Sequence, residues 1–105
     1  MDSVSVEARA DGALDVVLRG ELDFTNASEA IDRIRNAVVR NRPVRVRVEM
    51  GEVTFLDSSG IAVLVNAMRA AEEVGASYRV ENPNRKLRDQ LRMTGLLEPF
   101  GISES

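Results

Sequence analysis

Apolar and polar residues alternate at the start of the chain. Val4, Val6 and Ala8 are separated by polar residues, and this period of two is typical of a half-buried strand. Residues 14–19 form a second apolar-rich run with strand character. Asp11-Gly12 lies between the two runs and favours a tight turn, because glycine readily adopts a positive φ. The pattern predicts that the chain begins with an antiparallel hairpin.

Beyond the hairpin, apolar residues recur every three or four positions in three segments, which is the period of an amphipathic helix. The predicted helices are one from Ala27 that stops before Pro43, one from about Ser58 to Val74, and one between Pro83 and Gly95. Their expected buried residues are Ala27, Ile31, Ile34 and Val38, then Ile61, Leu64, Val65 and Met68, then Leu87 and Leu91 with Met93 as a further candidate. Strand patterns lie between them at residues 44–49, 53–56 and 77–81, and residues 96–102 are expected to add an edge strand or a packing segment.

Residues that start and stop helices flank these segments. Asn26 followed by Glu29 has the form of a capping box, in which both side chains bond free backbone N–H groups. Asn82 before Pro83 predicts a capping residue followed by proline at the first helical position. Gly75 supplies a stop for the second helix.

The order of the elements, a hairpin followed by alternating helices and strands, is typical of an α/β protein. Strands that alternate with helices pair in parallel through right-handed crossovers. The sequence therefore predicts a mixed sheet of four to five strands, with an antiparallel hairpin at its start, packed against about three helices. The chain has no internal repeat, low-complexity tract or linker, so residues 1–105 are expected to form a single domain.

Composition narrows the classes of function. The 105 residues are 44% hydrophobic and 30% charged, which suffices for a packed core. The net charge of −3 argues against nucleic-acid binding by phosphate neutralisation. The absence of cysteine and histidine removes the thiolate nucleophile, the commonest general base and the commonest metal ligand. The sequence also has no phosphate-binding loop and no nucleophile elbow, so we expect no enzyme, no metal and no cofactor.

Membrane insertion is not predicted. No apolar stretch approaches the ~20 residues that a membrane-spanning helix requires. Met1-Asp2-Ser3-Val4 does not resemble a signal peptide. We expect a soluble, cytoplasmic protein that is monomeric.

The segment Leu56-Asp57-Ser58-Ser59-Gly60 is the most informative one in the chain. It places two hydroxyls where an apolar strand becomes a helix, and there the first backbone N–H groups have no partner within the helix. The positive end of the helix dipole also favours negative charge at this point, by a few tenths to ~2 kcal/mol. Asp57 or Ser58 could cap the helix there, worth ~1 kcal/mol, or Ser58 could accept a phosphate at the same N–H groups. The residues alone leave both functions open.

Three carboxylates, Glu21, Asp23 and Asp57, lie at or just after the ends of strands. We expect Asp23 and Asp57 to share one edge of the sheet, because the carboxyl ends of parallel strands lie together. A divalent-metal site is one interpretation, but turn aspartates commonly bond the backbone ahead of them, and this second interpretation is favoured. The basic residues of the third helix are interpreted as its solvated face rather than as a contact for an acidic partner or a phosphate: Arg85, Lys86, Arg88 and Arg92.

These motifs resemble those of the STAS domain, specifically of the bacterial anti-sigma factor antagonists. The resemblance rests on Gly20-Glu21-Leu22-Asp23 after a hairpin and on residues 53–61, and it covers nearly the whole chain in the same element order. It implies a STAS-type sheet and a partner that is both an anti-sigma factor and a serine kinase. The resemblance further implies that binding to this partner displaces the sigma factor, that phosphorylation of Ser58 switches binding off, and that a metal-dependent serine phosphatase reverses the modification. Asp23 matches a family aspartate near the phosphorylated serine.

The resemblance also implies a partner-binding surface made of Glu21, Asp23, Asp57, Ser58, Ser59, Gly60 and Ile61. Ser59 is an alternative acceptor to Ser58. One departure is that family chains often continue into a further helix beyond the region matching residues 96–100, whereas this sequence ends at Ser105. Two other functions stay open: a non-phosphorylated STAS adaptor of a lipid-transport or stress-signalling complex, and a module that binds a nucleotide or another anion.

Overall fold

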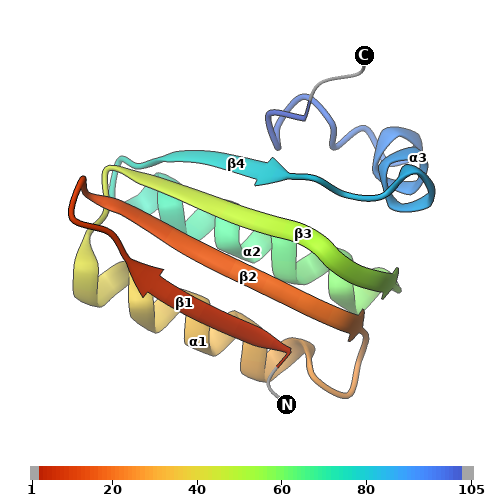
Figure 1. The fold of residues 1–105 in the computed structure, drawn as a ribbon, viewed down its shortest axis with the longest axis horizontal. Coiled ribbons are helices and arrows are strands. Elements are labelled where there is room, and N and C mark those ends of the chain that lie inside the picture. Colours follow the sequence, from red (N-terminus) through yellow and green to blue (C-terminus); the bar gives the residue numbers. More distant parts are fainter. Residues whose placement is uncertain (1–2, 103–105) are drawn as a thin grey trace.

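The computed structural model describes residues 3–102 and contains four strands and three helices in this part of the chain. In order these are β1 (Val4–Ala8), β2 (Ala13–Leu22), α1 (Ala27–Asn41), β3 (Arg45–Leu56), α2 (Ser58–Glu73), β4 (Ser77–Glu81) and α3 (Arg85–Met93). The strands form one sheet in the order β1-β2-β3-β4 (Figure 1). β1 and β2 are antiparallel, whereas β3 is parallel to both β2 and β4. The predicted mixed α/β sheet is confirmed.

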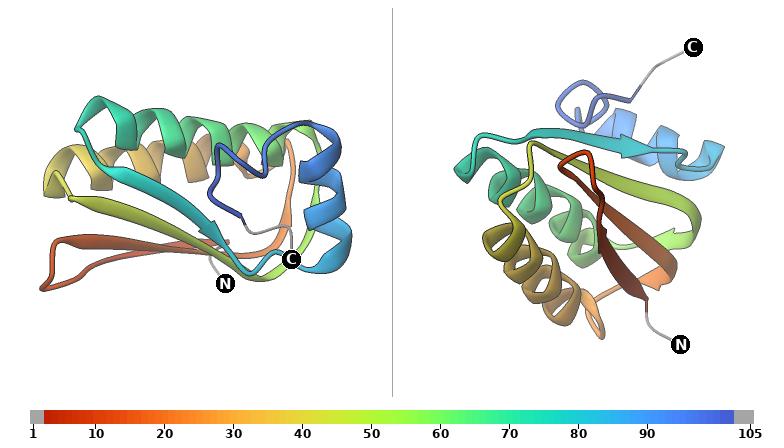
Figure 2. Two further views of the ribbon diagram at one scale, coloured as in Figure 1. Left: turned by 90° about the horizontal axis from the view of Figure 1, so that it is seen from above. Right: turned by 60° about the vertical axis from the view of Figure 1, so that its left-hand side comes forward.

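The helices are distributed unequally around the sheet. α1 and α2 lie side by side on one face, and no helix of the described chain covers the opposite face (Figure 2). α3 lies beyond the carboxyl end of β4 and beside the last residues of β3, and residues 94–102 then turn back along β4 (Figure 1). The two ends of the sheet therefore differ, because only one of them has α3 beside it. The predicted site lies at this end.

The core lies between the sheet and the pair α1 and α2. Leu14, Val16 and Leu18 of β2 alternate with solvent-facing residues and are almost fully buried, as are Val46 and Val48 of β3. Burial of each such side chain is worth about 1.5–3 kcal/mol. Among the described residues, no polar or charged side chain is buried, so these contacts are apolar throughout.

The third strand is longer than the sequence pattern predicts. β3 runs without interruption through Gly51 and Glu52, which were expected to separate two strands. Glu52 pairs with Arg19 of β2, and register shifts on either side of this pair absorb the irregularity. Val44, the expected first residue of the strand, precedes it and is 59% exposed.

Two predicted helix starts are wrong in detail. Asn26 occupies the capping position of α1, but its side chain makes no capping bond. The third helix begins at Arg85, and its cap is Asn84, whose Oδ1 accepts from the N–H of Leu87 at 2.9 Å. Asn82 instead adopts φ 58° and donates to Glu49 Oε1 at 2.9 Å, so it turns the chain before the helix begins.

The buried faces of α2 and α3 are also shifted from the prediction. In α2 the buried residues include Val63, Leu64, Ala67 and Ala71, while Ile61, Val65 and Met68 are only half-buried. The alanines lie on the inward face because small side chains let α2 approach the sheet and α1 closely. In α3, Leu87 and Leu91 are buried as expected, but Met93 is 87% exposed.

Residues 96–102 form a packing segment and no strand. Leu97 and Phe100 are buried, and the ring of Phe100 meets that of Tyr78 edge-on at 5.8 Å between centroids. The carbonyl of Phe100 accepts from the N–H of Val80 at 2.8 Å, which fastens the segment to β4. The stops predicted at Gly75 and Gly95 agree with their positive φ.

Candidate functional site

The carboxyl ends of β2 and β3 lie side by side. Glu21 pairs with Phe55, and Leu22 pairs with Leu56. One residue further on, the N–H of Asp57 donates to the carbonyl of Leu22 at 3.3 Å. Asp23 and Asp57 therefore leave the sheet at the same edge, as the alternation of strands and helices predicts. We call the surface formed by residues 21–26 and 55–61 the carboxyl edge.

Asp57 caps α2. Its backbone is extended, with φ −101° and ψ −169°, and its Oδ1 accepts from the N–H of Gly60 at 2.9 Å. Ser58 is consequently the first helical residue, and its side chain is exposed. Because the aspartate provides the cap, the Ser58 hydroxyl is not needed to start the helix and is accessible to solvent.

Gly60 is buried beneath this first turn. A Cβ atom at this position would lie 2.3 Å from the carbonyl oxygen of Leu22 and 2.9 Å from Cδ2 of Leu56. The residue therefore lets α2 approach the end of β2 and presents no side chain at the surface. A glycine in the first turn of a helix carries a propensity cost, which is a sequence signal for such a close approach.

The loop between β2 and α1 is held by its own side chains. Asp23 Oδ1 accepts from the hydroxyl and the N–H of Thr25, the latter at 2.9 Å. Asn26 receives the N–H of Asp23 at its Oδ1 (3.1 Å) and donates its Nδ2 to the carbonyl of Glu21 (2.8 Å). These bonds replace the predicted capping box. The sequence analysis missed Thr25 and assigned Asn26 to a helix cap instead of to this loop, although an aspartate two residues before a threonine favours such a turn.

Charge at the carboxyl edge is negative. The bonds from the Thr25 hydroxyl, and then from its N–H, hold the pKa of Asp23 below its usual range. Glu21 is exposed, while Asp57, Ser59 and Ile61 are half-buried. The carboxyl edge contains all seven predicted partner-binding residues, and all of them except the buried Gly60 are exposed or half-buried.

α3 also reaches this edge through one side chain that the sequence analysis missed. Gln90 Nε2 donates to the carbonyl of Leu56 at 2.9 Å. On the solvent side of α3, Arg85, Lys86 and Arg92 are exposed, and Arg92 pairs with Asp89 at 2.7 Å. This helix therefore supports the end of β3, and three of its four basic residues face water as predicted. The fourth, Arg88, is half-buried and its Nε is shielded from solvent, so the prediction of a solvated face is wrong for this residue.

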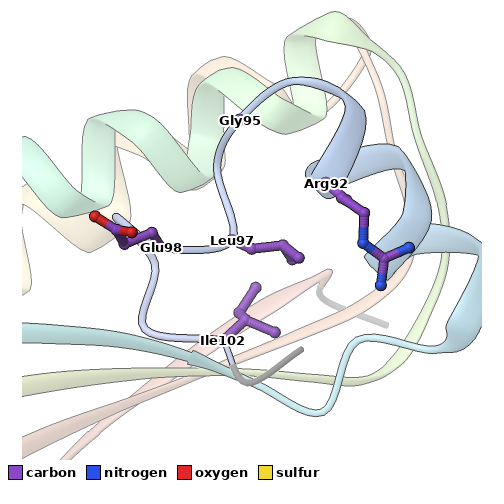
Figure 3. Close-up of a pocket in the computed structure, with 5 residues that line it drawn as sticks. All are labelled: Arg92, Gly95, Leu97, Glu98 and Ile102. Atoms are coloured by element: carbon purple, nitrogen blue, oxygen red, sulfur yellow. The ribbon is translucent and has the colours of Figure 1, made fainter. Parts of the chain in front are cut away.

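A separate hollow of about 370 Å³ lies between the end of α3 and the segment that follows it. Leu97 and Ile102 extend toward it, Arg92 borders it from α3, and Gly95 and Glu98 complete its lining (Figure 3). None of the predicted site residues lines this hollow.

Two further properties of the described chain concern metals and membranes. Within residues 3–102, no three carboxylate, histidine or cysteine side chains gather in a way that could hold a metal ion. In the same residues, no helix has the length and apolar character that crossing a membrane demands.

The fold and the carboxyl edge together define a small α/β domain with an exposed serine at a helix start. The sequence model of the STAS domain matches residues 6–105, and the chain belongs to this family. Among curated proteins, it is 24% identical over 90 residues to the anti-sigma-B factor antagonist of Bacillus subtilis (strain 168), covering 86% of this chain and 81% of that protein. It is 26% identical over 94 residues to the anti-sigma F factor antagonist of Paenibacillus polymyxa, covering 90% and 80%.

Solved structures share the fold. The unphosphorylated form of the anti-sigma factor antagonist SpoIIAA matches with a TM-score of 0.79 at 24% identity, over 92% of this chain and 84% of that one. The phosphorylated form of SpoIIAA from Bacillus matches with a TM-score of 0.72 at 24% identity, over 92% and 86%. An anti-sigma factor antagonist from Mycobacterium paratuberculosis matches with a TM-score of 0.79 at 27% identity, over 97% and 85%.

Proposed function

We propose that this chain is an anti-sigma factor antagonist that binds an anti-sigma factor through the carboxyl edge and thereby frees a sigma factor. The observation that carries the proposal is the exposed Ser58 at the first position of α2, next to Asp57 and on the same edge as Asp23. Relatives named as antagonists of anti-sigma factors, which match over most of their length, support it. The chain acts by binding in the cytoplasm and not as an enzyme.

The partner in this proposal is also a serine kinase, and Ser58 is its substrate. Oγ of Ser58 takes the γ-phosphoryl group of ATP and loses its proton, while the bond to ADP breaks. The hydroxyl suits this step because it is exposed and because Asp57, not Ser58, caps the helix. A metal-dependent serine phosphatase hydrolyses the phosphoserine and restores the binding form.

A phosphate on Ser58 is expected to leave the fold intact. It adds about −1.5 to −2 charge beside the free N–H groups and the positive dipole end of α2, where an anion is stabilised. The agreement of both the unphosphorylated and the phosphorylated SpoIIAA structures with this fold supports the expectation. The switch must therefore act on the surface that the partner meets.

The carboxyl edge already carries Glu21, Asp23 and Asp57. A phosphate dianion beside these carboxylates would be desolvated on docking, and repelled where the partner presents no positive charge opposite Ser58. An uncompensated charge of this kind at an interface costs several kcal/mol. About 3 kcal/mol already weakens binding roughly a hundredfold. A hundredfold difference in affinity is sufficient for the unmodified form to bind the partner while the phosphorylated form stays unbound.

The test is to incubate the chain with ATP and each anti-sigma factor kinase encoded in the same genome, and to measure the intact mass. We expect one phosphate on the wild-type chain and on Ser59→Ala, the matched control, and none on Ser58→Ala. Ser58→Ala should bind the kinase constitutively, and Ser58→Asp should bind more weakly because it carries about half the charge of a phosphate. Modification of Ser59 instead would contradict the assignment, and the absence of any kinase that modifies Ser58 would favour the adaptor function.

A further inference from the structure

Phe24 is the aromatic side chain of the carboxyl edge that is most open to solvent, with 79% of its surface exposed. We propose that Phe24 is the apolar anchor with which this edge selects its partner, filling an apolar recess that basic side chains surround. The inference rests on the proposed function, since it names the chemistry that the anti-sigma factor must present to the same site.

The loop that carries Phe24 is fixed before any partner arrives. Asp23 on one side bonds Thr25, and Asn26 bonds both the N–H of Asp23 and the carbonyl of Glu21. The N–H groups of Asn26 and Ala27 close the loop by donating to the carbonyl of Asp23 at 3.2 and 3.0 Å. A rigid loop that holds an aromatic ring in water loses little conformational entropy on docking, because the ring has only two rotatable bonds.

Phe24 and Ser58 each lie two residues after the end of a strand, Phe24 after β2 and Ser58 after β3, and these two strand ends are hydrogen-bonded to each other. The hydrogen bond from the N–H of Asp57 to the carbonyl of Leu22 lies two residues from Phe24 and one residue from Ser58. Phe55, which is 42% exposed, is paired across the strands with Glu21 and adds a second apolar side chain to the same edge. A partner that reads the phosphorylation state of Ser58 therefore meets Phe24 as well.

The charges around Phe24 indicate what covers it. Glu21 and Asp23 precede it in the sequence, and Asp57 follows the neighbouring strand. Asp23 is a carboxylate at neutral pH, and the bonds from Thr25 hold its pKa below the ordinary value. A second copy of this chain docking on the same patch would bring two sets of carboxylates together, which is costly. A partner whose arginine or lysine side chains face Glu21 and Asp23, rather than Ser58, instead meets complementary charge. Well-packed aromatic anchors of this kind dominate binding energies.

The experiment compares the wild-type chain with Phe24→Ala, Phe24→Leu and the control Val39→Ala, using as probe the purified anti-sigma factor kinase of the same genome. Val39 is a suitable control because it is an apolar residue of α1, 60% exposed, outside the carboxyl edge. Phe24→Ala should bind about 30-fold more weakly, mainly through faster dissociation. Phe24→Leu should recover part of this loss, and Val39→Ala should bind as the wild type does.

Two further measurements distinguish the loss of an apolar anchor from a loss of folding and from a change in charge. Phe24→Ala should leave the melting temperature unchanged, because the ring is exposed and makes no core contact. Asp23→Asn, in contrast, should change the association rate and its dependence on salt. If Phe24→Ala weakens binding without lowering the melting temperature, and Asp23→Asn changes mainly the association rate, Phe24 is an anchor and not a structural residue of the loop.

Three results would overturn the inference. If Phe24→Ala binds the kinase within about threefold of the wild type, Phe24 is not the anchor, while the proposed function stands. If the wild-type chain binds no anti-sigma factor kinase, the proposed function fails and the inference fails with it. If the wild-type chain forms a dimer in sedimentation equilibrium that Phe24→Ala abolishes, a second copy covers the patch.

Discussion

Replacement of Gly60 by alanine tests the contact that positions α2 at the carboxyl edge. The new Cβ would lie 2.3 Å from the carbonyl oxygen of Leu22, 2.9 Å from Cδ2 of Leu56 and 3.0 Å from Cβ of Leu22. Side-chain atoms can move away from such a contact, but the carbonyl oxygen belongs to the backbone of β2. The start of α2 must therefore shift relative to the sheet.

The expected change in the free energy of unfolding is the sum of two opposing effects. Inserting a methyl group into a closely packed site typically costs 1–3 kcal/mol, and the backbone contact places this site in the upper half of that range. Alanine has a higher helix propensity than glycine, and the gain offsets up to ~1 kcal/mol. We expect the free energy of unfolding to fall by about 2 kcal/mol, which lowers the melting temperature of a domain of this size by roughly 10 °C.

Urea unfolding followed by circular dichroism measures this change, with Glu72→Ala as a control on an exposed position of the same helix. The control should alter the free energy of unfolding by no more than ~0.5 kcal/mol. A Gly60→Ala variant that is as stable as the wild type, or more stable, would refute the close approach of α2 to Leu22.

Two further predictions concern capping and charge. Asp57→Ala should lower the free energy of unfolding by about 1 kcal/mol, because Oδ1 no longer accepts from the N–H of Gly60. Asp57→Asn should cost less, because asparagine also caps helices. Equal losses for the two variants in chemical denaturation would contradict the cap. Hydrogen bonds from Arg47 and then Arg9 lower the pKa of Asp15 from its ordinary 3.8 in the folded chain, so the stability it contributes is complete above that value and is lost as the pH falls through the folded-state pKa. Asp15→Asn should therefore flatten the acid limb of the stability profile measured by urea unfolding, and an unchanged limb would show that this carboxylate does not contribute.

Much of the site follows from the order of elements. A hairpin followed by alternating helices and strands requires β2 and β3 to end at one edge, which brings Asp23 and Asp57 together; the pairing of Leu22 with Leu56 shows this arrangement. The exposed serine at the start of α2 follows equally from an apolar strand that runs into a helical pattern. These features depend on local periodicity and on general rules of strand connection, which a single sequence carries.

The details that the sequence does not predict depend on contacts between distant segments. Asn82 and Asn84 are equally good capping residues by type, but Asn82 adopts a positive φ and bonds Glu49 of β3, so the helix begins only after Asn84. Asn26 is diverted from capping by acceptors and donors in the preceding loop. The burial of Gly60 requires knowledge that Leu22 lies against α2. In each case a residue from another segment of the chain determines which of several locally possible conformations or roles is adopted.

The measurement that tests the central claim most directly is the affinity of the chain for its anti-sigma factor kinase before and after stoichiometric phosphorylation of Ser58, with thermal melting of the same two samples. The account predicts that phosphorylation weakens binding about a hundredfold while the melting temperature changes little, because the phosphate lies at the start of α2 and outside the core. Equal affinity of the two forms, or a loss of binding that accompanies a large drop in melting temperature, would contradict it.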